Sequence, residues 1–328
     1  GAVNFAADVT LADGADLITA SAGTSNFRAG TNAGNSIESG GSYNVVVGDQ
    51  AGTAITTGDN NIAVGFAALD AEDTGSNNVA IGASALSTLN YNGSGYNTAV
   101  GSNAGAAVTT GIKNTILGGL AGDAITTGNS NVALGYSALG ANTTASNNTA
   151  VGVSALAVNT TGTQNVAVGS FSLDAVTTAS NNTAIGYLSG SSITTGASNT
   201  LLGSTAGDSI TTAANNTAVG QASLGLATTG ANNTAVGYLS GASLTTGNSN
   251  VAMGYNALGS DTLGDRAVAI GLSALASQNF TSSTDNYNIG IGYGAGLSIT
   301  TGTINTIIGG LAGDAITTGN SNVAVGYL

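Results

Sequence analysis

The stretch Asn148–Gln164, which reads NTAVGVSALAVNTTGTQ, is one copy of a 17-residue repeat that decides the fold of this chain. The Gly at its fifth position recurs along the sequence, and successive copies are 17 residues apart except at one step of 19 and one of 21. A fixed period of this size is typical of a solenoid, in which one short unit stacks on the next. The repeated glycines are Gly48, Gly65, Gly82, Gly101, Gly118, Gly135, Gly152, Gly169, Gly186, Gly203, Gly220, Gly237, Gly254, Gly271, Gly292, Gly309 and Gly326.

The residue types within one copy indicate strands and turns. We number the positions of each copy 1 to 17, so that Asn148 occupies position 1. Positions 2 to 4 are β-branched or small apolar residues, which favour a strand, and positions 13 to 15 read Thr-Thr-Gly or a close variant. No helical period fits, because Gly and Thr occur in every candidate window. We therefore expect an all-β parallel solenoid (a β-roll) with 17-residue coils over 41–328, with Val151, Val168 and Ile185 stacked in register.

Positions 9 and 12 compensate for each other in size. Where position 9 is Gly, as at Gly190, position 12 is large and apolar, as at Ile193. Where position 9 is Leu, as at Leu156, position 12 is usually small or polar. We interpret this as one core slot per coil, filled by one large side chain from either position, because a close-packed interior does not tolerate overfilling. The candidate core residues are Leu156, Leu173, Ile193, Ile210, Leu224 and Leu244.

Position 1 is Asn in every copy except the one that begins at Ala267. Asn stacked on Asn from coil to coil can form an amide ladder, although Asn also suits a turn for local reasons. The Gly at position 5 indicates a positive φ or a close backbone approach. The residues predicted to form this structural ladder are Asn148, Asn165, Asn182, Asn199, Asn216, Asn233, Gly152, Gly169, Gly186, Gly203, Gly220 and Gly237.

Three segments depart from the repeat. Residues 1–40 precede it, with a hairpin signal around Asp13-Gly14, and we expect them to form an N-terminal cap or connector. Insertions around 90–95 and 279–285 each lengthen one turn, and such loops are reasonable places for recognition. Because the last copy stops at Leu328, we expect the solenoid to continue beyond the chain end as part of a longer polypeptide.

The composition excludes several classes of function. With 3 Lys+Arg against 16 Asp+Glu and a net charge of -13, the chain lacks the cations that bind nucleic acid or anionic membranes. It has no Cys and no His, and no apolar run approaches the roughly 18 residues of a membrane-spanning helix. The best carboxylate cluster is Asp70, Glu72 and Asp73, which we interpret as a solvated turn. We therefore expect no enzymatic activity and no membrane insertion.

The remaining recurrent residues leave alternatives open. Asp at position 10 recurs too sparsely for a calcium ladder, so we expect no cofactor, with adventitious calcium as the alternative. Tyr follows the Gly in several copies, which suits packing or stacking on a sugar ring. The Thr-Thr pairs stack into rows, but adjacent residues of a strand point to opposite sides, unlike the alternating Thr of ice-binding solenoids.

The motif NTAVG or NVAIG, with a small residue three positions after the Gly, resembles the head repeats of trimeric autotransporter adhesins (YadA-like) and the NTAVG-type β-roll repeats of bacteriophage fibre proteins. The resemblance covers about 42–328. It implies a left-handed β-roll, three chains side by side, and a place on a cell surface or a virion. The repeat of that adhesin head is shorter, so the coil here is larger.

These observations together predict a non-enzymatic structural fibre or adhesin, a rigid extracellular or virion-associated rod that acts by multivalent attachment and self-assembly. The alternative is an ice- or glycan-binding solenoid module. The expected partner is the chain itself, as a parallel homotrimer with possible end-to-end joining into a filament, while a glycan or protein receptor stays unknown. We expect the strand face of small residues, such as Ala150, Ala184 and Ala235, to face the shared axis.

Overall fold

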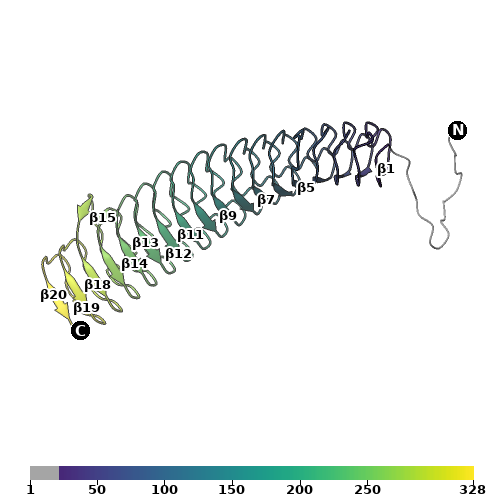
Figure 1. Ribbon diagram of the computed structural model, residues 1–328. Helices are drawn as coiled ribbons and strands as arrows, with labels where there is room; N and C mark the ends of the chain where they lie inside the picture. Colours follow the sequence, from purple (N-terminus) through teal and green to yellow (C-terminus); the bar gives the residue numbers. More distant parts are fainter. Residues whose placement is uncertain (1–21) are drawn as a thin grey trace, which may run out of the picture.

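The computed structural model describes residues 22–328, which form a gently curved rod of stacked coils (Figure 1). The described residues form twenty short strands and no helix. The hairpin expected around Asp13-Gly14 lies outside the described residues. The strands are β1 (Phe27–Ala29), β2 (Val45–Val47), β3 (Ile62–Val64), β4 (Val79–Ile81), β5 (Thr98–Val100), β6 (Thr115–Leu117), β7 (Val132–Leu134), β8 (Thr149–Val151), β9 (Val166–Val168), β10 (Thr183–Ile185), β11 (Thr200–Leu202), β12 (Thr217–Val219), β13 (Thr234–Val236), β14 (Val251–Met253), β15 (Gly264–Asp265), β16 (Val268–Ile270), β17 (Thr284–Asp285), β18 (Ile289–Ile291), β19 (Thr306–Ile308) and β20 (Val323–Val325).

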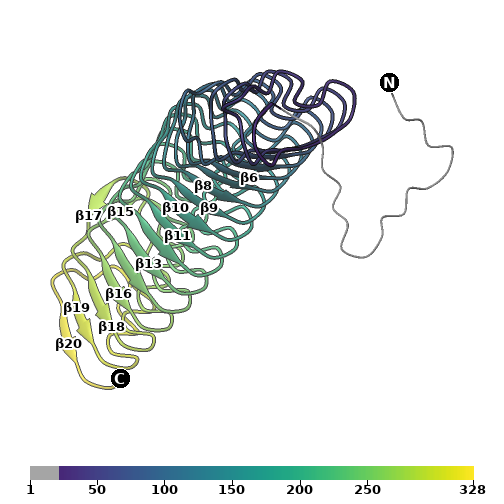
Figure 2. The same cartoon turned by 45° about the vertical axis from the view of Figure 1, so that its right-hand side comes forward.

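Eighteen of these strands form one continuous parallel sheet along the rod. Val151 pairs with Val168, and Val168 pairs with Ile185, so the predicted register and the predicted all-β solenoid are confirmed. The insertions lengthen the step from β4 to β5 and the step from β16 to β18 without interrupting the sheet. The second insertion adds a separate two-stranded ladder of β15 and β17, which lies to one side of the main row of strands (Figure 2).

The stack of coils reaches into the segment expected to be a cap or connector. β1 pairs in parallel with β2, so 26–40 form a coil of the same kind. The repeat motif cannot be recognised in the sequence of this coil, because its strand reads Phe-Arg-Ala and position 3, which faces inward, is Arg28. Arg28 is half-buried, and its Nε donates a hydrogen bond to the carbonyl of Ala33 at 2.7 Å. The long side chain of Arg28 thus covers the end of the core.

The Gly at position 5 allows adjacent coils to approach closely at the turn that ends each strand. In the six glycines of the predicted ladder, φ lies between 130° and 144°, a region that residues with a side chain rarely adopt. A Cβ on Gly203 would lie 2.6 Å from the carbonyl carbon and oxygen of Gly220 in the next coil. Both the backbone conformation and the close approach therefore require Gly at this position.

Position 9 also has a left-handed backbone, whichever residue occupies it. Its φ is 61° at Gly190 and 51° at Leu156. Gly takes this conformation without strain, whereas Leu accepts a strained backbone and fills the core with its side chain. The predicted core residues all lie at positions 9 or 12 and are at most 1% exposed; they are Leu156, Leu173, Ile193, Ile210, Leu224 and Leu244.

A third position, which the sequence analysis missed, shares the core slot. Position 3 carries a large residue where a coil and the coil before it both have Gly at position 9. Leu201 lies between Gly190 and Gly207, and a Cβ on either glycine would lie within 2.8 Å of a Leu201 methyl group. Val46, Ile116 and Ile307 occupy the same place in three other pairs of coils. The core is therefore balanced over two coils rather than within one.

Overfilling this shared space should be measurable. We expect Gly190→Leu to destabilise its coil by about 1–3 kcal/mol, because a Cβ there would lie 2.7 Å from Leu201 Cδ1 and 3.1 Å from Ile193 Cδ1. Adding Ile193→Asn should recover part of the loss, and adding Leu201→Ala as well should recover most of it. Native-state hydrogen exchange of β10 and β11 measures the effect. A triple variant no more stable than the single variant would show that the three positions do not share space.

Candidate functional site

The Asn residues at position 1 form a buried ladder, which is more than amide stacked on amide. Each side chain joins two coils, as Asn182 illustrates. Its Nδ2 donates to the carbonyl of Gly196 in its own coil at 2.9 Å, and its Oδ1 accepts the backbone N–H of Asn199 in the next coil at 3.0 Å. The predicted ladder residues Asn148, Asn165, Asn182, Asn199, Asn216 and Asn233 are at most 1% exposed. They therefore lie inside the solenoid, out of reach of a ligand.

The ladder has one interruption, at Ala267, and a substitute acceptor repairs it. The N–H of Ala267 still donates to Asn250 Oδ1 at 2.8 Å, but its methyl group offers nothing to the next coil. The orphaned N–H of Asn288 donates instead to Oδ1 of Asn286, at 2.9 Å, and Asn286 lies at the end of the second insertion. A buried N–H without a partner is costly, so the insertion supplies the acceptor that the missing Asn would have given.

Buried carboxyl groups perform a related task in the coil that precedes each insertion. Glu72 was expected in a solvated turn, but it is 0% exposed and points into the core at position 12. Its Oε1 accepts the N–H of Gly75 at 2.8 Å. In three other coils the N–H at this position donates to a carbonyl of the next coil, as Gly111 does to Thr126, whereas the N–H of Gly75 has no such backbone partner. Asp261 accepts the N–H of Gly264 in the same way, at 3.0 Å.

Burial sets the charge of these carboxyl groups. It raises the pKa of Glu72 to about 7, and the nearby backbone N–H groups only partly oppose this effect. Burial also raises the pKa of Asp261, although the side chain of Gln278 donates to its Oδ2 at 2.6 Å. Both groups are enclosed by protein, so we interpret their raised pKa as a consequence of the fold and not as the mark of an active site.

The other two members of the expected carboxylate cluster have different surroundings. Asp70 is half-buried, and burial raises its pKa. Asp73 accepts a hydrogen bond from the hydroxyl of Thr56 in the preceding coil. With Glu72 in the core, Asp70 and Asp73 are the two members of the cluster that reach the surface. Within 22–328, no group of three His, Cys, Asp or Glu residues is placed to hold a metal ion.

The outer surface of the sheet differs from the expected one. Ala150, Ala184 and Ala235 at position 3 are 0% exposed and face the core, so the expectation that they face a shared axis is wrong. Because side chains alternate along a strand, positions 2 and 4 face outward instead. Position 3 can be small because the large side chain that fills the core comes from position 9 or 12, on the opposite side of the coil. The outward row at position 4 is aliphatic and includes Ile185 and Leu202, which are 38% and 44% exposed.

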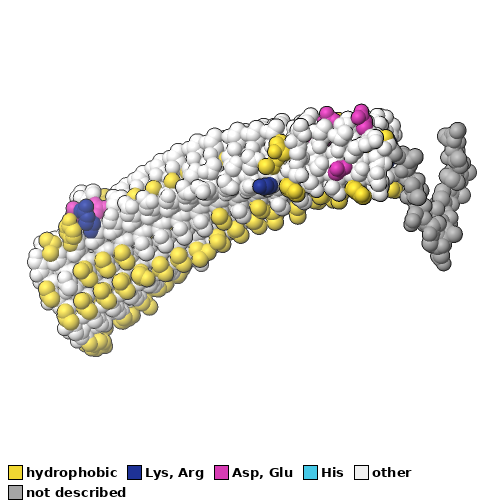
Figure 3. Space-filling model, viewed as in Figure 1, with side chains coloured by type: hydrophobic (Ala, Val, Ile, Leu, Met, Phe, Trp, Pro, Cys, Tyr) yellow, Lys and Arg dark blue, Asp and Glu magenta, His cyan; other side chains and the backbone are white. Residues whose placement is uncertain are grey.

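We call the outward side chains at positions 2 and 4 of β2–β14, β16 and β18–β20 the sheet face. Position 2 is Thr, Val or Ile and position 4 is Val, Ile, Leu or Met in every one of these coils. No charged residue occurs on the sheet face, although the chain carries a net charge of -13. Figure 3 shows hydrophobic side chains in rows along this edge of the rod, with the charged groups elsewhere. An uncharged surface of this length with one row that is aliphatic throughout is unusual for a protein surrounded only by water.

The Tyr and Thr rows lie outside the core. Tyr136, Tyr187 and Tyr238 at position 6 are 47–56% exposed, and the rings of Tyr238 and Tyr255 lie 5.7 Å apart between centroids. Thr at position 13 is held to the next coil, as where the Thr160 hydroxyl donates to the carbonyl of Thr177 at 3.0 Å. Thr at position 14 is exposed. The two threonines of a pair therefore have different environments.

Three comparisons with known proteins gave no match. No family model, no curated protein and no solved structure matches the chain. The described part of the chain contains no helix that is long and apolar enough to span a membrane. The sheet face, which follows the main sheet along the rod, is the most extensive surface feature of the described residues.

Proposed function

We propose that this chain is a non-enzymatic structural rod of an extracellular or virion-associated fibre, which acts by self-assembly and multivalent attachment. The observation that supports the proposal is the sheet face, two rows of uncharged side chains that run along every strand of the 18-stranded sheet except β1. At about 4.8 Å per coil, this face is roughly 80 Å long. Water-exposed aliphatic rows gain free energy when a second apolar surface covers them.

The partner that fits this face best is another copy of the chain. A parallel copy has the same spacing between coils, so its aliphatic residues meet equivalent residues at every level. Because the sheet face carries no charged residue, no like charges face each other across the contact, although each chain has a net charge of -13. Three copies arranged around one axis bury the face of each chain, and closed cyclic symmetry is the usual form of such assemblies. We therefore propose a parallel homotrimer.

Analytical ultracentrifugation tests this assembly. We expect the particle to have three times the 31.1 kDa mass of one chain. The double variant Leu202→Lys with Val219→Lys should give single chains, because six ammonium groups would crowd two adjacent levels of the contact. Val158→Lys is the matched control, since Val158 is 43% exposed at position 11, away from the sheet face. A wild-type particle of one chain at micromolar concentration would refute the proposal.

A second candidate function, ice binding, is favoured by the same face in one part of the rod. Four consecutive coils have Thr at position 2, namely Thr183, Thr200, Thr217 and Thr234, beside the aliphatic row. This arrangement gives evenly spaced hydroxyl and methyl groups on a regular sheet. An ice-binding role requires the face to be free, whereas the structural rod requires it to be covered. A thermal-hysteresis measurement on the same sample therefore distinguishes the two candidates.

A further inference from the structure

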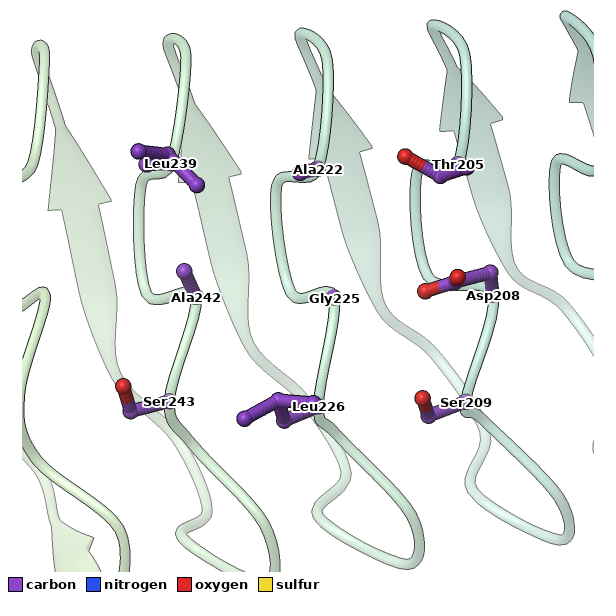
Figure 4. Close-up of a pocket in the computed structure, with 9 residues that line it drawn as sticks. All are labelled: Thr205, Asp208, Ser209, Ala222, Gly225, Leu226, Leu239, Ala242 and Ser243. Carbon is purple, nitrogen blue, oxygen red and sulfur yellow. The ribbon is translucent and has the colours of Figure 1, made fainter.

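We propose that a groove on the turn side of the rod binds one pyranose ring of a neutral sugar. The groove crosses the coils of β11, β12 and β13 and has a volume of about 300 Å³. Its nine lining residues are drawn in Figure 4, where the strands lie behind the turns that carry them. The groove is therefore separate from the sheet face, and this proposal does not depend on the assembly proposed above.

The groove exists because the middle coil is locally small. Ala222 and Gly225 occupy positions 7 and 10 of that coil, where the preceding coil has Thr205 and Asp208. Thr205 and Asp208 thus form one rim of the groove, and Leu239 at position 7 of the following coil forms the other. Backbone hydrogen bonds between coils hold the floor, for example from Leu226 N–H to the carbonyl of Ala242 at 2.9 Å. The site is thus formed in the absence of a ligand, which lowers the cost of binding.

The floor of the groove offers an apolar contact of the size of one sugar ring. Leu226 is 56% exposed and extends from the middle coil toward Ser243, while Leu239 stands on the following coil (Figure 4). With Ala222 and Ala242, these side chains form the apolar part of the lining. The C–H face of a pyranose is apolar, and ligand sites usually combine such a surface with a few polar groups that fix orientation.

The rim supplies the polar groups. The carboxylate of Asp208 points from the preceding coil toward Gly225, over the groove (Figure 4). Burial raises the pKa of Asp208, which shows that its carboxylate is partly removed from water. No hydrogen bond within 22–328 uses the hydroxyl of Ser209 or Ser243, and both residues line the groove. A carboxylate accepts two hydroxyl donors, and a serine hydroxyl both donates and accepts, so the rim matches the edge of a polyol ring.

Charge selects among sugars. The lining contains one carboxylate and no cation. A sugar with a carboxylate of its own would meet the charge of Asp208 without compensation, whereas a neutral hexopyranose has no charge and offers hydroxyl donors to that carboxylate. Monovalent binding at a shallow site of this size should be weak, with a dissociation constant of about 1 mM or higher. The repetition of such a site in each copy of the chain would raise the overall affinity on a surface.

Saturation-transfer NMR with methyl glucopyranoside and methyl galactopyranoside tests the proposal on the full chain. We expect transfer to the C–H protons of at least one of the two sugars, and little transfer to methyl glucuronate. Gly225→Leu should abolish it, because the new side chain would occupy the groove. Position 10 carries side chains in neighbouring coils, so we expect this variant to fold, and circular dichroism checks this. Asp208→Asn should weaken binding about tenfold, the effect of losing a charged acceptor.

The chain offers a matched control for Asp208. Asp123 occupies the same position 10 and is likewise followed in the next coil by a glycine, Gly140, but no leucine equivalent to Leu226 is present there. Asp123→Asn should leave sugar binding unchanged. Absence of transfer to both neutral sugars, equal transfer to the glucuronate, or unchanged transfer in Gly225→Leu would each overturn the proposal. None of these results bears on the assembly measured by ultracentrifugation.

Discussion

Gly186→Ala is expected to destabilise the coils around β10 by more than about 4 kcal/mol, an exceptional loss for the addition of one methyl group. Two effects combine. The φ of Gly186 is 140°, and a non-Gly residue held in such a conformation costs on the order of 1–3 kcal/mol. In addition, the new Cβ would lie 2.3 Å from the carbonyl oxygen of Gly203 and 2.9 Å from the backbone nitrogen of Ser204. These are backbone atoms of the next coil, which cannot move without opening the sheet.

Gly326→Ala separates the two effects. Gly326 has a φ of 145°, close to that of Gly186, but no atom lies within 4 Å of the place where its Cβ would be. This variant should therefore lose only the conformational part. Hydrogen exchange of the strands adjacent to each substitution gives the two local free energies of opening. Equal losses in the two variants would mean that the close approach between coils contributes nothing.

Glu72→Gln is expected to stabilise the coils of β3 and β4 at alkaline pH and to change little at acid pH. The folded chain holds the pKa of Glu72 at about 7, against an ordinary value of 4.5. An acid whose pKa is raised by folding stabilises the fold least when it is ionised. The local stability of the natural protein should therefore fall as the pH rises from about 4.5 to about 7, and stay low above that. At roughly 1.4 kcal/mol per pH unit, the loss is about 3 kcal/mol.

The Gln variant removes this pH dependence because its amide oxygen can still accept the N–H of Gly75 and carries no charge. We expect a gain of about 3 kcal/mol over the natural protein at pH 8 and almost none at pH 4. Native-state hydrogen exchange of β3 and β4 at the two pH values measures it. Glu38→Gln is the control, since Glu38 is exposed. A gain that was the same at both pH values would contradict the assignment of the effect to ionisation.

The sequence predicted the repeating geometry well because the same constraint acts at every coil. The 17-residue register, the Asn ladder at position 1 and the compensation in size between positions 9 and 12 follow from residues that recur many times. Each coil must fit the coil before it, so the residue types that a position requires can be recognised from their repetition. The coil that contains Arg28 was missed because its strand shares almost no residue types with the others, although its backbone follows the same path.

The surfaces were harder to predict. Ala150 was placed outward because a small residue suits a close contact between chains, but small residues also suit a thin core. The strand's period of two decides only that positions 2 and 4 lie opposite position 3, and both assignments satisfy it. The bond between the buried Glu72 and Gly75 lies next to a coil that an insertion lengthens, and the groove depends on size differences among three successive coils. Both features depend on neighbouring coils, so neither can be predicted from the residue pattern of one coil.

The 17-residue path around each coil has a mechanical consequence. Neighbouring coils are joined along the rod by hydrogen bonds, while the covalent chain runs around the circumference. A pull along the axis therefore acts on the last coil of the stack, whose contacts break before those of the coils behind it. Each coil that unwinds replaces a rise of about 4.8 Å by roughly 55 Å of extended chain. Under tension the rod lengthens in discrete steps and absorbs mechanical work while the remaining coils stay folded.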